Sequence, residues 1–291
     1  MSVTAKPLGS GIGAEIAGVD LRTKLGRDEI DGVIAAINQY AVVVFRHDGE
    51  ITDAQHLAFG RALGPLQKIQ LVTTLGKTKT RLSSNELIDV SNLDEQGRIL
   101  SAEDRRRKFQ DGNRLWHTDV SFDDNRAVYS MLAAHVLPPG GGPDTEFADM
   151  RAAYDALPAA MKTRIEPLIA EHDIWYSRAL GGLTEVSPAE RATRPRARHK
   201  LVHVHPHSGR KSLYLASHIA RLVGMAEKEG RALLDELGAF ATQPRFVYAH
   251  KWCEGDLLMW DNLATMHRAN EYEDLRYVRD MRRATTLERA A

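Results

Sequence analysis

The segment RLWHTDVSF places a histidine and a carboxylate two residues apart, at His117 and Asp119. If the segment is a β-strand, side chains at positions i and i+2 point to the same face. The imidazole and the carboxylate could then bind one metal ion. Because a His-x-Asp pair is frequent by chance, the pair predicts a metal site only if another residue completes the ligand set.

His267 is the candidate for that further ligand. It follows a buried-looking strand expected at 256–260 and a short polar turn. Two imidazoles and one carboxylate on one face of an octahedral ion leave three positions open, which is typical of non-haem Fe(II) centres that bind a co-substrate together with O2. A structural zinc site would need four protein ligands, and no fourth ligand is evident.

Two arginines lie four residues apart in RYVRDMRRATT, at Arg279 and Arg283. On a strand they would share one side, while Arg282 would point to the other. Inward-pointing guanidinium groups are costly to bury unless anions meet them, and bidentate pairing with a carboxylate meets that need. The pair therefore predicts a site for acids, with a solvated basic tail as the alternative.

The segment HVHPHSGRK carries alternating histidines at His203, His205 and His207. A zinc hydrolase centred on His203 and His205 is conceivable, since alternate residues of a strand share a face. Pro206 would interrupt a strand ladder, and SGRK is typical of a turn, so packing roles are favoured. The GSGIGA segment at 9–14 matches a dinucleotide fingerprint in spacing only, because the eight residues before it do not predict the buried strand that such a site needs.

Strands dominate the middle and the end of the chain, with helices at the start and as insertions. This pattern favours a β-barrel or sandwich core over a doubly wound α/β fold. We expect one domain over 1–291, helical insertions around 150–200 and 225–240, and a mobile loop or the flank of a lid around EDRRRK at 103–108. Strands are expected at 41–46, where the β-branched run is typical of a buried strand, and at 114–122, 127–138, 200–206, 212–217, 245–252, 255–262 and 276–286. Helices are expected at 28–40, 52–63, 150–168 with an interruption at Pro158, from 187 onward, and 225–240. Thr52 with Gln55, and Ser187 with Glu190, predict capping boxes at the start of two of these helices.

Charge and cysteine content narrow the classes of partner. The chain has 39 basic and 39 acidic residues, so its charge suggests neither a nucleic-acid nor a membrane partner. The single cysteine, Cys253, excludes internal disulfides and fits a reducing cytosol. No signal-peptide core and no apolar run of membrane-spanning length is evident, so we expect a soluble, cytoplasmic protein.

Taken together, His117-x-Asp119, WDN followed by His267, and two arginines before ATT resemble the taurine dioxygenase branch of the 2-oxoglutarate-dependent Fe(II) dioxygenases. The resemblance covers almost the whole chain and is strongest toward the herbicide-degrading members. It implies a double-stranded β-helix (jelly roll). The implied reaction is hydroxylation of the ether-side carbon of aryloxyacetic acids such as 2,4-dichlorophenoxyacetate, which gives a phenol, glyoxylate, succinate and CO2. The segments that carry it are AGVDLR, VVVFR, LGPL, LWHTDVSF, DTEFADMRAAYDALP, HPHSGRK, FVYAHKW, GDLLMWDN and MRRATTLE.

The resemblance also implies roles for the residues of the metal and co-substrate sites. His117, Asp119 and His267 would bind Fe(II), with O2 and 2-oxoglutarate as co-substrates. Thr145 and Arg279 would hold the distal carboxylate of 2-oxoglutarate.

On the substrate side, the resemblance implies that Arg283 and the backbone amide of Ser121 hold a small-molecule carboxylic acid. The family pattern also has a lysine past GPL, for which Lys68 is the stand-in here and apolar Leu71 the alternative. A sulfonate or other alkanoate dioxygenase is the nearest rival, because Arg283 would bind a sulfonate as readily. A non-catalytic metal-binding β-barrel would have no use for two buried arginines. Homo-oligomers are common in the family, so we expect one here.

Overall fold

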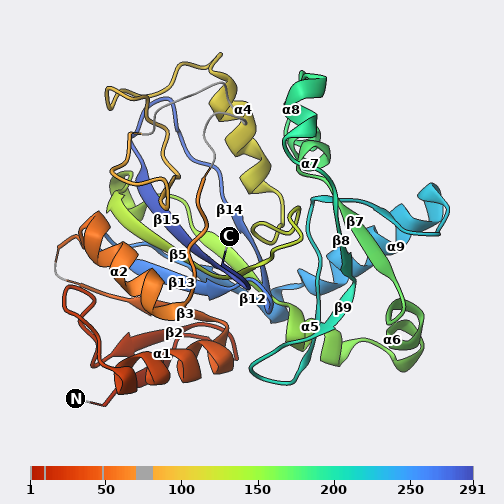
Figure 1. Cartoon of the computed structure of the whole chain (residues 1–291), viewed down its shortest axis with the longest axis horizontal. Coiled ribbons are helices and arrows are strands. Elements are labelled where there is room, and N and C mark those ends of the chain that lie inside the picture. Colours follow the sequence, from red (N-terminus) through yellow and green to blue (C-terminus); the bar gives the residue numbers. More distant parts are fainter. Residues whose placement is uncertain (1, 10, 48, 70–80, 291) are drawn as a thin grey trace.

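The strands gather into one large sheet and three small ones in the computed structural model, which describes residues 2–9, 11–47, 49–69 and 81–290. The large sheet runs in the order β1-β2-β3-β13-β5-β15-β4, and of its neighbouring pairs only β2 and β3 are parallel. Figure 1 shows β13, β5 and β15 side by side at its centre. Its strands are β1 (Thr4–Pro7), β2 (Ala14–Ala17), β3 (Val42–Phe45), β4 (Ile88–Asp89), β5 (Ala127–Val136), β13 (Leu257–Asp261) and β15 (Asp280–Leu287).

A second antiparallel sheet, in the order β12-β6-β14, packs against the large one. Val42 and Val44 of β3 share a buried core with Phe147 of this sheet, whereas Val43 and Phe45 face the opposite side. Both faces of β3 are covered, which explains why VVVF is apolar at every position. The predicted jelly roll is confirmed. The strands of the second sheet are β6 (Thr145–Asp149), β12 (Val247–His250) and β14 (Thr265–Ala269).

Helices α1 (Arg27–Tyr40) and α2 (Asp53–Leu63) cover the outer face of the large sheet, next to β3 in Figure 1. The predicted capping box of α2 is present, since the Thr52 hydroxyl accepts from the Gln55 amide at 3.3 Å. Both helices begin and end within one residue of their predicted bounds.

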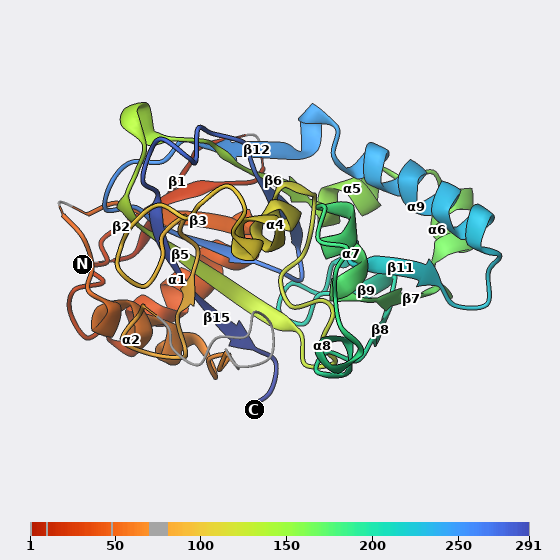
Figure 2. The same ribbon diagram turned by 90° about the horizontal axis from the view of Figure 1, so that it is seen from above.

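Helices α5 to α9 and strands β7 to β11 form the second lobe seen in Figure 2. Pro158 separates two helices as predicted, and Ser187 caps a third through Glu190. The helices are α5 (Met150–Ala156), α6 (Ala159–Ile165), α7 (Ile174–Leu180), α8 (Pro188–Ala192) and α9 (Glu227–Ala241). The strands are β7 (Ile169–His172), β8 (Ala197–Lys200), β9 (Val202–Val204), β10 (Lys211–Leu213) and β11 (Ile219–Leu222).

Three arginines meet one buried glutamate on the β11-β7-β8 sheet. The Glu171 carboxylate accepts from Arg221 at 2.9 Å, from Arg198 at 3.0 Å and from Arg196 at 2.9 Å. The bond from Arg221, with those from the other two guanidiniums, lowers the pKa of Glu171 to about 2 against the opposing effect of burial. Glu171 is therefore ionised throughout the physiological range.

The expectation of a loop at 103–108 is wrong, because most of this stretch belongs to helix α4 (Arg105–Asp111). Asp104 caps the helix by accepting from the Arg106 amide at 2.9 Å. The charge run is not solvated as a loop would be: Arg106 pairs with Asp104 and Arg107 with Asp274, each at 2.7 Å.

Residues 70–80, which include Leu71, lie outside the described part. None of the helices described has the length and apolar content needed to cross a bilayer.

Candidate active site

His117, Asp119 and His267 come together where the segment before β5 forms a bridge with β14. One ligand atom from each side chain lies within 4.8 Å of the others, and no other group of three or more such potential ligands occurs among the described residues. The Nε2 atoms of His117 and His267 lie 3.9 and 3.8 Å from the two Asp119 oxygens. All three side chains are buried.

A single β-bridge, followed by a turn, positions these residues. The His117 amide donates to the His267 carbonyl at 2.9 Å, and the His267 amide donates back at 2.8 Å. The predicted strand at 114–122 is wrong beyond this bridge, because the chain turns at Val120, whose φ of 56° lies in the left-handed region. His117 and Asp119 converge as their i, i+2 spacing predicts, and the chain turns directly after Asp119.

Both histidines are neutral, as metal ligation requires. The His117 Nδ1 atom lies 2.8 Å from the Leu115 carbonyl and donates to it, which directs the Nε2 lone pair toward Asp119. Burial lowers the pKa of His117 to about 4, although Asp119 acts in the opposite direction. Burial also lowers the pKa of His267 well below its usual value.

Asp119 is held by hydrogen bonds on both carboxylate oxygens. Arg283 Nη1 donates to Oδ1 at 2.5 Å, and the Ser130 hydroxyl donates to Oδ2 at 2.8 Å. Asn262 accepts from the Asp119 amide at 3.2 Å and donates to the Ser130 hydroxyl at 3.0 Å. Burial would raise the pKa of Asp119, but the Arg283 guanidinium and the two imidazoles lower it to about 2.

This donor set fits an Fe(II) ion. It offers two neutral imidazole nitrogens and one ionised carboxylate, whose ligand atoms lie within 4.8 Å of one another. Two cavities adjoin these residues, so exchangeable ligands have room. Such an arrangement is diagnostic of non-haem iron oxygenases rather than of closed zinc sites.

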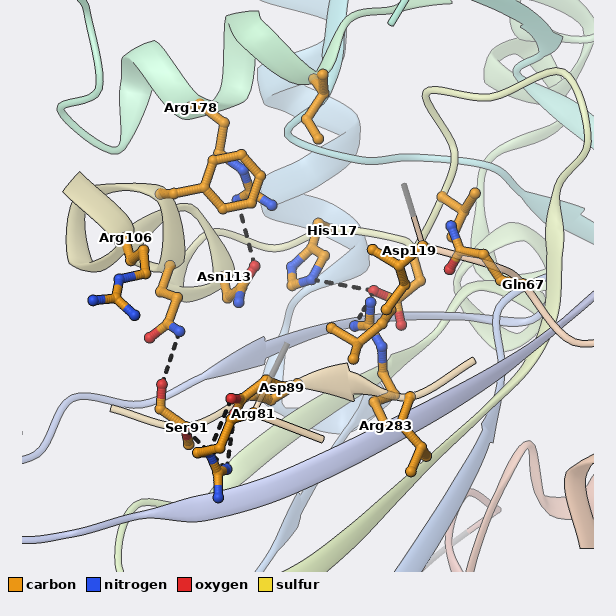
Figure 3. A pocket seen from close by; sticks show the side chains of 18 of the residues that line it. Gln67, Arg81, Asp89, Ser91, Arg106, Asn113, His117, Asp119, Arg178 and Arg283 are labelled. Atoms are coloured by element: carbon orange, nitrogen blue, oxygen red, sulfur yellow. Dashed lines mark hydrogen bonds and ion pairs between the residues drawn. The ribbon is translucent and has the colours of Figure 1, made fainter. Parts of the chain in front are cut away.

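The two cavities meet at the metal group, since His117 and Arg283 line both. The larger has a volume of about 250 Å³ and its wall is mainly apolar, with Leu87, Phe109 and Phe122 among its lining residues. Figure 3 shows Arg283 and Asp119 side by side in its wall, close to His117. The smaller has a volume of about 100 Å³.

Thr145 and Arg279 line the smaller cavity together. The Thr145 hydroxyl accepts from the Trp252 indole at 3.0 Å. Arg279 is buried, and its Nε atom has no hydrogen-bond partner among the described residues. Burial lowers the pKa of Arg279 to about 10, with Tyr272 opposing the shift, so the group is still a cation at neutral pH. As predicted for a strand, Arg282 points the other way and pairs with Asp53 at 2.7 Å.

Ser121 lies between two residues of the larger cavity wall, Val120 and Phe122. Its side chain is fully buried and lies 3.0 Å from the His172 Nδ1 atom. The turn at 118–122 therefore runs along the cavity beside the metal group.

Lys68 is not brought to the site. It is exposed, whereas its neighbours Gln67 and Ile69 line the larger cavity. Lys68 lines neither of the two cavities, so its role as a substrate contact stays a prediction.

The histidines of HVHPHSGRK do not form a metal group within the described residues. The His203 Nε2 atom lies 2.7 Å from the Leu263 carbonyl, and the His205 Nε2 atom lies 2.7 Å from Asp261. The His205 Nδ1 atom accepts from the Ser208 amide at 3.1 Å. The packing interpretation therefore holds. His205 also holds Asp261, whose other carboxylate oxygen accepts from the Leu263 amide in the turn that precedes His267.

Several residues of the site were not singled out from the sequence. Ser130 is a polar residue inside the apolar run AVYSMLAAHV, a signal that could have found it. Asn262 lies in the WDN motif but had no assigned role. Arg178, which lines the larger cavity, stands in the ordinary helical pattern IWYSRAL, which offers no such signal.

Comparisons with known proteins agree with this geometry. Residues 4–285 match the model of a family described as "Taurine catabolism dioxygenase TauD, TfdA family". The chain is 42% identical over 290 residues, covering 100% of this chain and 99% of the relative, to the alpha-ketoglutarate-dependent 2,4-dichlorophenoxyacetate dioxygenase of Cupriavidus pinatubonensis. It is 35% identical over 275 residues, or 92% of this chain and 89% of the relative, to the (S)-phenoxypropionate/alpha-ketoglutarate-dioxygenase of Sphingobium herbicidovorans. The crystal structure of AAD-2 in complex with Mn(II) and N-oxalylglycine superposes with a TM-score of 0.94 at 43% identity, covering 100% of this chain and 99% of that one.

Proposed function

This chain belongs to the taurine catabolism dioxygenase TauD, TfdA family, and we propose that within it the enzyme hydroxylates aryloxyacetic acids such as 2,4-dichlorophenoxyacetate. It is a 2-oxoglutarate-dependent non-haem iron dioxygenase. The observation that carries the substrate proposal is the junction of two cavities at one metal group, where Arg279 lines the smaller cavity and Arg283 lies at the junction. Two acids can therefore bind beside the metal at once.

In this proposal His117, Asp119 and His267 bind the Fe(II) ion. Their burial, their charge states and their closeness support the assignment. With 2-oxoglutarate and O2, the bound iron supplies the oxidant for C–H hydroxylation. Arg283 and Ser130 keep Asp119 ionised and oriented, so the ligand face is formed before any acid enters.

Thr145 and Arg279 would hold the distal carboxylate of 2-oxoglutarate. The buried cation at Arg279 and its free Nε–H call for an anion, and the smaller cavity suits a small acid. The Trp252 indole occupies one lone pair of the Thr145 hydroxyl and leaves its proton available for a carboxylate oxygen.

Arg283 and the Ser121 amide would hold the substrate carboxylate, with the aryl ring in the larger, apolar cavity. Fixing the acid end beside the metal group places the neighbouring OCH2 carbon next to it, which is the protein's main contribution to rate. Hydroxylation of that carbon gives a hemiacetal, which collapses to a phenol and glyoxylate. A substrate contact from Lys68 stays a prediction, since its side chain is exposed.

The test is aerobic incubation of the purified enzyme with Fe(II), 2-oxoglutarate and 2,4-dichlorophenoxyacetate, with released phenol measured against a control lacking 2-oxoglutarate. We expect phenol release that depends on 2-oxoglutarate. Succinate formed with taurine or another acid, without phenol from the aryloxyacetate, would discard the substrate and favour the sulfonate or alkanoate alternative.

Two proposals concern the surroundings of the enzyme. The lone Cys253 and the balanced charge support a cytoplasmic location, which cell fractionation would test. Assembly into a homo-oligomer is proposed from the family resemblance, and light scattering of the purified protein would test it.

A further inference from the structure

Arg178 is a buried arginine in the wall of the larger cavity. It lies on α7 and is 6% exposed, and it lines the cavity together with His117, Asp119 and Arg283. Figure 3 shows Arg178 entering from one side of His117 and Arg283 from the other. Two guanidiniums from different elements, α7 and β15, therefore face the same space beside the metal group.

Arg178 forms no ion pair with an acid among the described residues. Its Nη1 atom donates to the neutral amide of Asn113 at 3.4 Å, and its Nε atom has no partner there. Burial and the nearby Arg283 lower the pKa of Arg178 to about 10, with Asp119 opposing the shift, which still leaves a cation at neutral pH. An unpaired buried cation is costly, so the fold keeps it only where something else compensates.

Arg151 shows how this fold treats a buried arginine that serves the structure. It is 1% exposed, and Asp149 accepts from its Nε and Nη2 atoms, each at 3.0 Å. The Asn38 carbonyl accepts from its Nη1 atom at 2.7 Å. Arg178 has neither kind of partner, which separates it from a packing role.

The backbone is nevertheless shaped around Arg178. A Cβ atom at Gly112 would lie 2.0 Å from its Nη1 atom, so only glycine leaves room for the guanidinium. The guanidinium also lies over the Phe109 ring, 4.2 Å from its centroid. The group is thus held in place with its Nε donor free and a single long hydrogen bond to Asn113, as in a preorganised anion site.

We propose that Arg178 is a second substrate-binding arginine, which holds the substrate carboxylate opposite Arg283. The inference rests on the proposed function, in which that carboxylate enters the larger cavity. Arg283 already donates to Asp119 and can give the substrate only part of its fork. Arg178 does not line the smaller cavity, so 2-oxoglutarate is not its partner. The residue would therefore select acids over neutral analogues of the same shape.

The test is anaerobic calorimetry on enzyme loaded with Mn(II) and 2-oxoglutarate, a readout that needs no turnover. Wild-type, Arg178→Gln and Arg178→Lys enzymes are titrated with 2,4-dichlorophenoxyacetate and with its neutral amide, 2,4-dichlorophenoxyacetamide. We expect Arg178→Gln to lose about 30-fold or more in affinity for the acid, and threefold or less for the amide. Arg178→Lys should recover part of the loss, and exposed Arg191→Gln should change neither.

Gly112→Ala provides a second variant that keeps the charge and displaces the guanidinium, so it should reproduce the selective loss. If a thermal melt shows that Arg178→Gln is not folded, Gly112→Ala and Arg178→Lys replace it in the comparison with the wild-type enzyme. Equal losses of affinity for the acid and the amide would overturn the proposal and indicate a packing role. A loss of affinity confined to 2-oxoglutarate, or no loss at all, would also overturn it. If the wild-type enzyme releases no phenol, the proposed function fails, but the role of Arg178 is still open to test. The comparison is then made with the acid that yields succinate and with its neutral amide, and the same outcomes support or overturn the role of Arg178.

Discussion

Replacing Ser130 by alanine should weaken metal binding without disturbing the fold. Ser130 is fully buried in β5, and its hydroxyl donates to Asp119 at 2.8 Å. A hydrogen bond to a charged group contributes about 1.5–3 kcal/mol, and loss of such an outer partner typically costs 10–100-fold in metal affinity. Because Arg283 still holds the other Asp119 oxygen, we expect the lower end, a loss of about 10-fold or about 1.4 kcal/mol.

The assay is calorimetric titration of the metal-free enzyme with Mn(II), which avoids oxidation of the metal. Ser212→Ala is the matched control, since Ser212 is also fully buried but donates only to the Leu213 carbonyl, at 3.3 Å, on β10. Urea unfolding of both variants separates a loss of stability from a loss of metal affinity. Equal Mn(II) affinities for wild-type and Ser130→Ala enzyme would refute the reasoning, because Asp119 would then not depend on this bond to bind the metal.

Three further predictions concern the acids, the stability and the metal count. Arg279→Ala should cost about 2–5 kcal/mol of 2-oxoglutarate binding and Arg283→Ala a similar amount of substrate binding, and equal effects on both acids in separate titrations would contradict the assignment. Glu171 has a pKa of about 2 in the folded state, below its ordinary value, so its arginine pairs stabilise the protein above about pH 5 and are lost as the pH falls toward 2. Because those arginines are half exposed, we expect this contribution to the free energy of unfolding to be only about 1–3 kcal/mol between about pH 7 and pH 3, measured by urea unfolding. Glu171→Gln should lack this contribution. Metal analysis of His203→Gln should still find one ion per chain, whereas a zinc centre at that histidine would lose it.

Local signals in the sequence predicted much of the fold. The Thr52 and Ser187 capping boxes and the break at Pro158 act over three or four residues, so neighbours in the chain suffice to read them. The VVVF run predicted a strand covered on both faces, which β3 is. The stretch at 103–108 was misread because ion pairs to Asp104 and Asp274 neutralise its arginines, and Asp274 lies far along the chain.

The composition of the candidate metal group was predictable, but the path of the chain beside it was not. The residue types of His117, Asp119 and His267 indicate iron, and the structure brings all three together. The convergence of His117 and Asp119 follows their i, i+2 spacing, but the strand predicted to continue to residue 122 gives way to a turn at Val120. Spacing patterns report regular structure, whereas a turn with positive φ at a β-branched residue has no sequence signature.

The charges of the site explain why its arginines differ in how far sequence predicts them. Arg279 and Arg283 stand out in the sequence because they lie four residues apart in one predicted strand, and two inward cations imply two anions. Arg178 comes from a helix more than a hundred residues earlier, and only the fold brings it to the same cavity. Arg178 and Arg279 are buried and form no ion pair with a carboxylate of the described residues, whereas the partly buried Arg283 pairs with Asp119. These two buried cations match the two acids of the proposed reaction, so the substrates themselves complete the charge balance of the core.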